Sequence, residues 1–274
     1  MADPQRSVTM DIEPTAPNAR QQSKAAEIVN PGGRSDYILV CDHASNAIPA
    51  EYGTLGLARE QLREHIAWDI GAAAVTRRLA ERLDASAVLS RFSRLVIDPN
   101  RMPDDPSLIV TVTHNVAVPG NMSLTPNDTR WRKATFYDAY QAAVAEMIDE
   151  WRVTGRIPAL VSIHSFTPVI EKFARPWQIG LLWDRDPRLK DALYRELSRH
   201  PDLVIGDNEP YSGRGPAGTM ELHGMQRGLP HVLIEIRQDL ISQASGVEQW
   251  SGLIGTALEA AIQDRSLLTV RHYR

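Results

Sequence analysis

The chain has 274 residues, of which 43% are hydrophobic and 23% are charged, and this composition is ordinary for a globular protein. Its formal net charge of −4 gives no global basic field for nucleic acid, and its apolar stretches are shorter than the roughly 18 residues that span a bilayer. The single cysteine, Cys41, excludes an intramolecular disulfide framework and fits a reducing compartment. The first thirty residues lack the apolar core of a secretory signal, so we expect a cytoplasmic protein that binds neither nucleic acid nor membranes.

The chain begins with a polar segment and continues as alternating strands and helices. Residues 1–35 are rich in Pro, Gln, Ala and Asn, so we expect a flexible polar arm there and one α/β domain over residues 36–274. Strands are expected to begin near residues 37 and 159 and to cover residues 88–90, 95–98, 178–183, 203–205 and 232–236. Periodicity predicts helices over residues 57–83, 131–151, 186–199, 219–227 and 247–264, and residues 100–127 read as a long irregular stretch with strand character at 108–112. Strands that alternate with helices predict a mostly parallel mixed sheet with helices on both faces.

Two apolar strand-like runs each end in a histidine. The first run, residues 37–41, is followed by Asp42 and His43, and the second, residues 159–163, is followed by His164. In open α/β sheets ligands bind beyond the carboxyl ends of the strands, so two imidazoles delivered there can share one metal ion. The alternative is that each histidine only caps its strand.

A carboxylate in the first predicted helix is the candidate third ligand. At 100° per residue, Asp69 lies in the centre of the apolar stripe of this helix, where a carboxylate requires a cation, a donor or a metal. His65, one turn earlier, could form a structural hydrogen bond with Asp69 or could itself be a ligand. Two histidines and one carboxylate are typical of hydrolytic zinc sites, so His43, His164 and Asp69 predict such a site.

Polar residues around the strand predicted at 95–98 are candidates for binding an anion. Asn100 and Arg101 follow this strand, and Arg94 lies just upstream of it. A planar guanidinium binds a carboxylate bidentately, which lysine does poorly. These residues predict an anionic ligand, although each arginine alone could equally bond backbone carbonyls.

A glutamate in an apolar strand is the candidate general base. Glu235 lies between two isoleucines and is expected to point inward or to lie at the strand end. A carboxyl group in apolar surroundings can have a raised pKa and act as a base. The alternative is a structural ion pair with Arg237 or another arginine.

A polar loop and the helix after it supply further candidate contacts. Asn208 and Tyr211 lie in a Gly/Pro-rich loop over residues 208–218, which could close over a small substrate or be an ordinary surface turn. His223, in the following helix, could donate to a substrate. The chain lacks dinucleotide-binding and P-loop glycine spacings and a Gly-x-Ser-x-Gly elbow, which argues against nucleotide binding and against a serine hydrolase.

Together, several segments resemble the N-formylglutamate amidohydrolase family from about Tyr37 to Leu240. No single segment is specific, but their number and order are. The segments are CDHASN (41–46), HIAWDIGA (65–72), SRLVIDPNR (93–101), PGN (119–121), SIHSFTP (162–168), RPW (175–177), DNEPYS (207–212) and IEIRQDL (234–240).

More distantly, the chain is similar to the zinc carboxypeptidase and aspartoacylase group, which implies a zinc-carboxypeptidase-like fold. That group uses a His-x-x-Glu pair, an Asn-Arg pair, a later His and a late Glu. The residues in the same order here are His43, Asn100, Arg101, His164 and Glu235. Asn46 stands where the metal-binding Glu of the group would be, and Asn is a poor zinc ligand. The third ligand therefore stays open between Asp69, His65 and Asn46.

The family resemblance implies metal-dependent hydrolysis of a small anionic N-acyl amino acid, typically N-formyl-L-glutamate, to formate and L-glutamate. Glu235 would take a proton from a water acidified by a divalent metal ion, most simply zinc, and Arg101, helped by Asn100, would bind a substrate carboxylate. Further substrate contacts are expected from Arg94, Tyr211, Asn208 and His223. The alternatives are a related deacylase or small-peptide hydrolase, and a non-catalytic small-molecule-binding α/β protein, which Asn46 favours.

Overall fold

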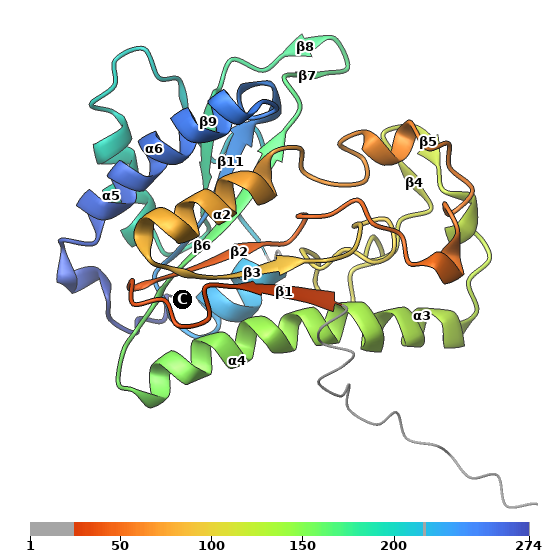
Figure 1. Cartoon of the computed structure of the whole chain (residues 1–274), viewed down its shortest axis with the longest axis horizontal. Coiled ribbons are helices and arrows are strands. Elements are labelled where there is room, and N and C mark those ends of the chain that lie inside the picture. Colours follow the sequence, from red (N-terminus) through yellow and green to blue (C-terminus); the bar gives the residue numbers. More distant parts are fainter. Residues whose placement is uncertain (1–24, 216–217, 274) are drawn as a thin grey trace, which may run out of the picture.

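A mixed sheet forms the centre of the computed structural model, which describes residues 25–215 and 218–273 (Figure 1). In sheet order, the seven strands that these residues form are β1 (Ala26–Val29), β3 (Ser86–Ser90), β2 (Tyr37–Cys41), β6 (Ala159–Phe166), β11 (His231–Arg237), β9 (Ile179–Leu182) and β10 (Ile205–Asp207). The four strands from β3 to β11 are parallel, whereas β1 runs antiparallel to β3 and β9 runs antiparallel to β11. At the far edge, β10 is parallel to β9. The predicted single α/β domain with a mostly parallel mixed sheet is confirmed.

Helices cover both faces of this sheet, as predicted (Figure 1). One face carries α2 (Ala72–Leu83), α5 (Arg188–Leu197) and α6 (Ala244–Ala261). The other face carries α3 (Pro126–Arg132), the π-helical η4 (Lys133–Asp138), α4 (Ala139–Val153) and the π-helical η5 (Met220–Met225). Short 3-10 segments are η1 (Ala50–Tyr52), η2 (Gln61–Arg63), η3 (Pro119–Asn121), η6 (Gln238–Leu240) and η7 (Arg265–Leu267). No helix within the described residues has both the length and the apolar character needed to cross a membrane.

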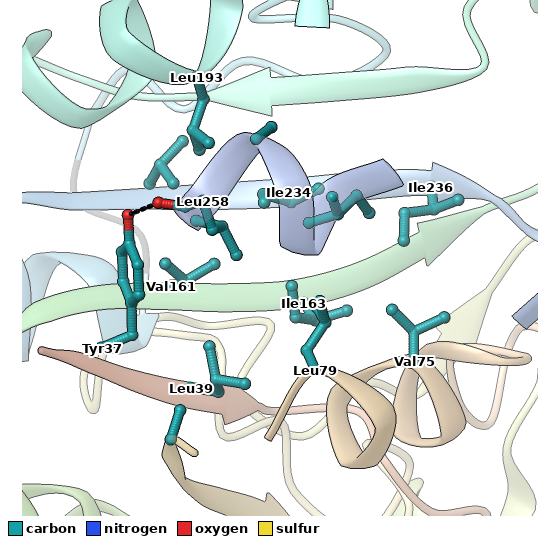
Figure 2. Close-up of a cluster of buried hydrophobic side chains, with 14 of the residues drawn as sticks. Tyr37, Leu39, Val75, Leu79, Val161, Ile163, Leu193, Ile234, Ile236 and Leu258 are labelled. Atoms are coloured by element: carbon teal, nitrogen blue, oxygen red, sulfur yellow. Dashed lines mark hydrogen bonds between the residues drawn. The ribbon is translucent and has the colours of Figure 1, made fainter. Parts of the chain in front are cut away.

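Side chains alternate along β6 and β11, and this alternation sets the polar residues apart from the apolar ones. The residues that point into the core beneath α2 and α6 are Val161, Ile163, Ile234 and Ile236 (Figure 2). The intervening positions face the α4 side, where Leu160 and Leu233 pack. Ser162, His164 and Glu235 have the parity of these two leucines, so these three polar side chains lie on one face of the sheet.

The helix predicted over residues 57–83 is wrong in its first half. Residues 57–71 form turns and the short η2, and α2 begins only at Ala72. Gly71 has a φ of 85°, which breaks the helical backbone, and the Asp69 N–H donates to the His43 carbonyl at 3.0 Å. Asp69 is buried as predicted, but it lies in a turn that packs against the end of β2 and not on a helical stripe.

Several other predictions of local structure need correction. Residues 26–29, assigned to the polar arm, form the edge strand β1, and the arm residues 1–24 lie outside the described part. Residues 95–98 form no strand, and the Asp98 N–H donates to the Leu108 carbonyl in place of a neighbouring strand. The strand character at 108–112 is limited to the hairpin of β4 (Val112–Thr113) and β5 (Val116–Ala117). A second hairpin, β7 (Val169–Ile170) and β8 (Phe173–Ala174), was not expected (Figure 1).

The backbone at Gly71 should tolerate no side chain, because a Cβ there would lie 2.4 Å from the Ile241 carbonyl oxygen and φ is positive. Gly71→Ala should lower the free energy of unfolding by about 2–5 kcal/mol, combining left-handed strain with a steric clash. Gly155 has a φ of +77° but open space around it, so Gly155→Ala should cost only about 1–2 kcal/mol. Denaturant unfolding measures both values, and equal losses would contradict the close approach at Gly71.

Candidate functional site

Two histidines and one aspartate meet in a buried cluster at the carboxyl ends of β2 and β6. His43 lies two residues beyond β2, His164 lies within β6, and Asp69 comes from the turn before α2. The distance to Asp69 Oδ2 is 2.8 Å from His164 Nδ1 and 3.5 Å from His43 Nδ1. One ligand atom from each residue lies within 4.8 Å of the others, so the three could hold a metal ion.

Each histidine is held from behind by a second carboxylate. His43 Nε2 is 2.7 Å from Asp98 Oδ1, and His164 Nε2 is 3.0 Å from Asp42 Oδ2. Asp42 is fully buried and also accepts hydrogen bonds from the hydroxyls of Tyr140, Ser162 and Thr219. The Nε2 atoms are therefore fixed by carboxylates while the Nδ1 atoms face Asp69.

Asp42 and Asp98 were not among the residues predicted to form the site. Both stand beside residues that were predicted, since Asp42 precedes His43 and Asp98 precedes the Asn100-Arg101 pair by two residues. A carboxylate at the end of a wholly apolar strand is the signal that could have identified Asp42, because such a group needs donors.

The carboxylates and His164 shift one another's protonation. Burial alone would lower the pKa of His164, but the hydrogen bonds to Asp42 and Asp69 outweigh it and raise this pKa to about 10. Burial would raise the pKa of Asp69, yet the Arg94 guanidinium and the two histidines hold it well below its usual range. The pKa of Asp98 is likewise lowered, against the effect of its burial, by His43 and the nearby arginines.

Glu235 lies opposite His164 in the register of β11 with β6. It is 6% exposed, and its Oε2 has no hydrogen-bond partner among the described residues. Burial raises the pKa of this carboxyl group to about 7, and the His164 cation opposes the rise. No ion pair between Glu235 and an arginine is present in the described part of the chain, which disfavours the structural alternative.

A cavity of about 310 Å³ opens onto this cluster. Most of the residues that the sequence selected line it, namely His43, Asp69, His164, Glu235, Arg94, Asn100, Arg101 and Tyr211. The side chain of Arg101 is 50% exposed, with Nε 3.8 Å from Asp98 Oδ2. Asn100 Oδ1 is buried without a hydrogen-bond partner in the described structure, and Arg94 pairs with Asp69 Oδ1.

Asn208 and His223 do not line this cavity, in contrast to the substrate contacts predicted for them. Asn208 Oδ1 accepts hydrogen bonds from the backbone N–H groups of Trp183 and Gly213, at 3.0 and 2.9 Å. His223 Nε2 is buried 2.8 Å from Gln141 Oε1, beneath α4. Both side chains therefore have structural bonds in place of ligand contacts.

The two other candidates for a third ligand are placed differently from Asp69. Asn46 donates its amide to the Leu62 carbonyl at 2.8 Å. His65 lines the cavity, with Nδ1 3.5 Å from Asp69 Oδ1, and burial lowers its pKa to about 3. Its ring stacks at 6.3 Å on that of His114, a cavity residue that was not predicted because it lies without a companion in the stretch expected to be irregular. In the structure, His114 lies in the turn of the β4–β5 hairpin.

Comparison with known proteins relates the chain to a family. The sequence model of the N-formylglutamate amidohydrolase family matches residues 35–242. The crystal structure of a gene product from Agrobacterium tumefaciens has a TM-score of 0.85 and 38% identity, over 90% of this chain and 98% of that one. N-formylglutamate amidohydrolase from Ralstonia eutropha has a TM-score of 0.68 and 22% identity, over 89% and 99%, and supports the fold. None of the curated proteins matches the chain. The resemblance found in the sequence is confirmed.

The ion pairs of His164 should make the metal-free protein less stable at alkaline pH. A pKa raised from 6.5 to about 10 adds stability that is complete below pH 6.5 and is lost as pH rises toward 10. His164→Asn should therefore cost most near pH 6.5 and progressively less toward pH 10, measured by denaturant unfolding after chelation. His223→Asn, at a buried histidine whose pKa is lowered to about 4, should cost the same across this range. A pH-independent cost for His164→Asn would contradict the ion pairs.

Proposed function

The chain belongs to the N-formylglutamate amidohydrolase family, and we propose that it hydrolyses the amide of a small N-acyl amino acid, most readily N-formyl-L-glutamate to formate and L-glutamate. The observation that carries the proposal is the pairing of the buried His43–Asp69–His164 cluster with Glu235 in one cavity. A potential cation site and a carboxyl group of raised pKa are the two parts that metal-dependent hydrolysis of an amide uses.

The cluster suits a divalent cation such as Zn²⁺. Two imidazoles and one carboxylate are the donor set of hydrolytic zinc sites, and the buried Nδ1 of His43 has no hydrogen-bond partner in the described residues. Carboxylates on the far nitrogens, here Asp42 and Asp98, are the usual support for metal-binding histidines. When bound, such an ion polarises a carbonyl oxygen and lowers the pKa of a coordinated water.

Glu235 is suited to move the proton of the reaction. Its carboxyl group lines the cavity, and its unpartnered Oε2 is free to accept a proton from the attacking water and then to give it to the leaving amine. A pKa near 7 favours both transfers at neutral pH, because a group that must gain and lose a proton works best when its pKa is close to the ambient pH.

Arg101 and Asn100 are suited to hold the substrate. The half-exposed guanidinium of Arg101 is only loosely paired with Asp98, so it can take a substrate carboxylate. The unpartnered Oδ1 of Asn100 beside it can accept a hydrogen bond from an N–H group of the substrate. Arg94 is occupied by Asp69, so its part is to add positive charge to the same wall.

The position of Asp69 argues against the alternative that the chain is a non-catalytic small-molecule-binding protein. That alternative rested on Asn46, which replaces a ligand of the carboxypeptidase group. Asp69 supplies the missing carboxylate from another part of the chain, and this favours an enzyme over a binding protein that has lost its metal.

Removal of metal should abolish activity. Chelator-treated protein should release no formate from N-formyl-L-glutamate, and one equivalent of Zn²⁺ per chain should restore the release, because the cluster offers one set of ligands. N-acetyl-L-glutamate and small peptides should be hydrolysed at least tenfold more slowly. Full activity in protein shown to be metal-free would contradict the cation, and faster hydrolysis of the acetyl or peptide substrates would favour the related deacylase.

Replacement of the proposed base should remove turnover and spare the metal. Glu235→Gln keeps the shape of the side chain but cannot take a proton, so kcat should fall about 10²–10⁴-fold. Metal content, measured by elemental analysis, should stay the same. Glu27→Gln on the edge strand β1 is the matched control and should keep the wild-type rate.

The pH profile of the wild type provides an independent check on Glu235. The base must be unprotonated, so kcat/KM should rise with pH through an acidic limb and then level off. The limb should lie between the ordinary value of 4.5 and about 7, because burial raises the pKa of Glu235 and a bound cation lowers it. The residual rate of Glu235→Gln should lack this limb. If it keeps the limb, another group is the base.

A further inference from the structure

Arg175 is a buried cation beside the cavity. It follows the β7–β8 hairpin, and its backbone N–H donates to the Pro168 carbonyl at 2.9 Å, closing the base of this hairpin (Figure 1). The residue is 4% exposed. Its guanidinium lies 4.8 Å from the ring centre of Tyr211 and 5.6 Å from that of Phe166. The charge is therefore enclosed mainly by aromatic and polar side chains.

No carboxylate in the described part of the chain lies within ion-pair distance of Arg175. Its side-chain hydrogen bonds all come from Nη1, to Thr167 O, Thr167 Oγ1 and Tyr211 Oη at 3.2, 3.3 and 3.1 Å. A buried guanidinium without a counter-ion is costly, so an anion bound nearby would compensate the charge of Arg175.

Two other buried arginines show what a purely structural guanidinium looks like here. Arg188 is paired with Asp186 through both Nε and Nη2. Arg132 lacks a carboxylate but uses both Nη1 and Nη2, toward Val96 O, Asn121 Oδ1 and Gly120 O. Arg175 differs from both, because only its Nη1 donates hydrogen bonds within the described residues, so its charge is less fully compensated.

Tyr211 connects Arg175 to the cavity. The tyrosine is 36% exposed and lines the cavity, whereas Arg175 lies behind it. Its Oη accepts from Arg175 Nη1, so its own O–H proton is left for another acceptor. The cation behind the hydroxyl polarises it, which strengthens a hydrogen bond to an anion.

The backbone holds Tyr211 in this place. The loop is fixed by Asn208, and the Glu209 carbonyl packs so closely on β9 that a Cβ on Gly180 would lie 2.0 Å from it. Gly180 is the register partner of Glu235 on β11. The loop that carries Tyr211 is therefore anchored beside the strand pair that carries Glu235, and both side chains line the cavity.

We propose that Tyr211, backed by the charge of Arg175, forms a second carboxylate-binding subsite, separate from that of Arg101. The inference rests on the proposed function, because a dicarboxylic N-formyl amino acid has one carboxylate for each subsite. Tyr211 contacts the ligand, and Arg175 is a positioning residue that acts through it.

Substrates that lack one charge separate the two subsites. The zinc-loaded protein is assayed with N-formyl-L-glutamate, N-formyl-L-glutamine and the α-amide of N-formyl-L-glutamate. Tyr211→Phe and Arg175→Met should each lower kcat/KM for the dicarboxylate about ten- to a hundredfold, and should change it less than threefold for one of the two amides. Arg101→Ala should spare the other amide. Tyr194→Phe, an exposed tyrosine on α5, is the control and should change none of the three.

Either of two results would overturn the subsite. Equal losses on all three substrates would make Tyr211 and Arg175 structural. If Arg101→Ala and Tyr211→Phe spare the same amide, both residues bind the same carboxylate of the substrate and the second subsite does not exist. If Arg175→Met does not fold, Tyr211→Phe decides alone, since it removes a single oxygen atom.

A binding experiment keeps this proposal distinct from the proposed function. Titration calorimetry on the zinc-loaded protein should show glutarate binding at least tenfold tighter than its monoamide, and Tyr211→Phe should abolish the difference. This result together with no formate release would defeat the proposed function and leave the subsite standing. Equal affinity of the wild type for the two compounds would defeat the subsite.

Discussion

The site depends on the burial of one carboxylate, that of Asp69. Its Oδ2 faces both histidines and accepts from the Ser165 N–H at 3.2 Å, and its Oδ1 is paired with Arg94. A buried carboxylate is costly unless it is compensated on every side. The residues that compensate Asp69 come from the end of β2, from β6 and from the loop after β3, so its charge holds together three segments that are far apart in the chain.

The acidic groups of the cavity are compensated unequally by cations and hydrogen-bond donors, and their pKa values differ as a result. Asp42, Asp69 and Asp98 each have cationic or hydroxyl partners, and their pKa values are lowered. Glu235 shares the same surroundings with no hydrogen bond to its Oε2, and its pKa rises to about 7. Neighbouring carboxylates whose pKa values are pushed apart in this way can divide the work of binding and of proton transfer.

The sequence was most informative where function depends on strand order and parity. Parallel strands deliver their carboxyl ends to one edge of a sheet, so the positions of His43 and His164 after apolar runs were enough to bring them together. Glu235 could be selected because side chains alternate along a strand, so a carboxylate between two isoleucines lies on the face opposite to theirs. Asp69 was selected because it was predicted to be buried, and the structure confirms its burial. The helix on which that prediction was based is absent at this position, since α2 begins only at Ala72.

The amino-acid sequence was sufficient to predict the α/β sheet, the residues that its strands carry to one edge, and the family. The tertiary structure alone decided which groups pair: Asp42 with His164 across 122 residues, Asp98 with His43 across 55, and Arg175 with Tyr211 across 36. It also decided that Asn208 and His223 form hydrogen bonds with other groups of the protein and do not line the cavity. The reason is that apolar periodicity is local and can be read along the chain, whereas hydrogen bonds and desolvation depend on distances that exist only after loops without periodicity have folded.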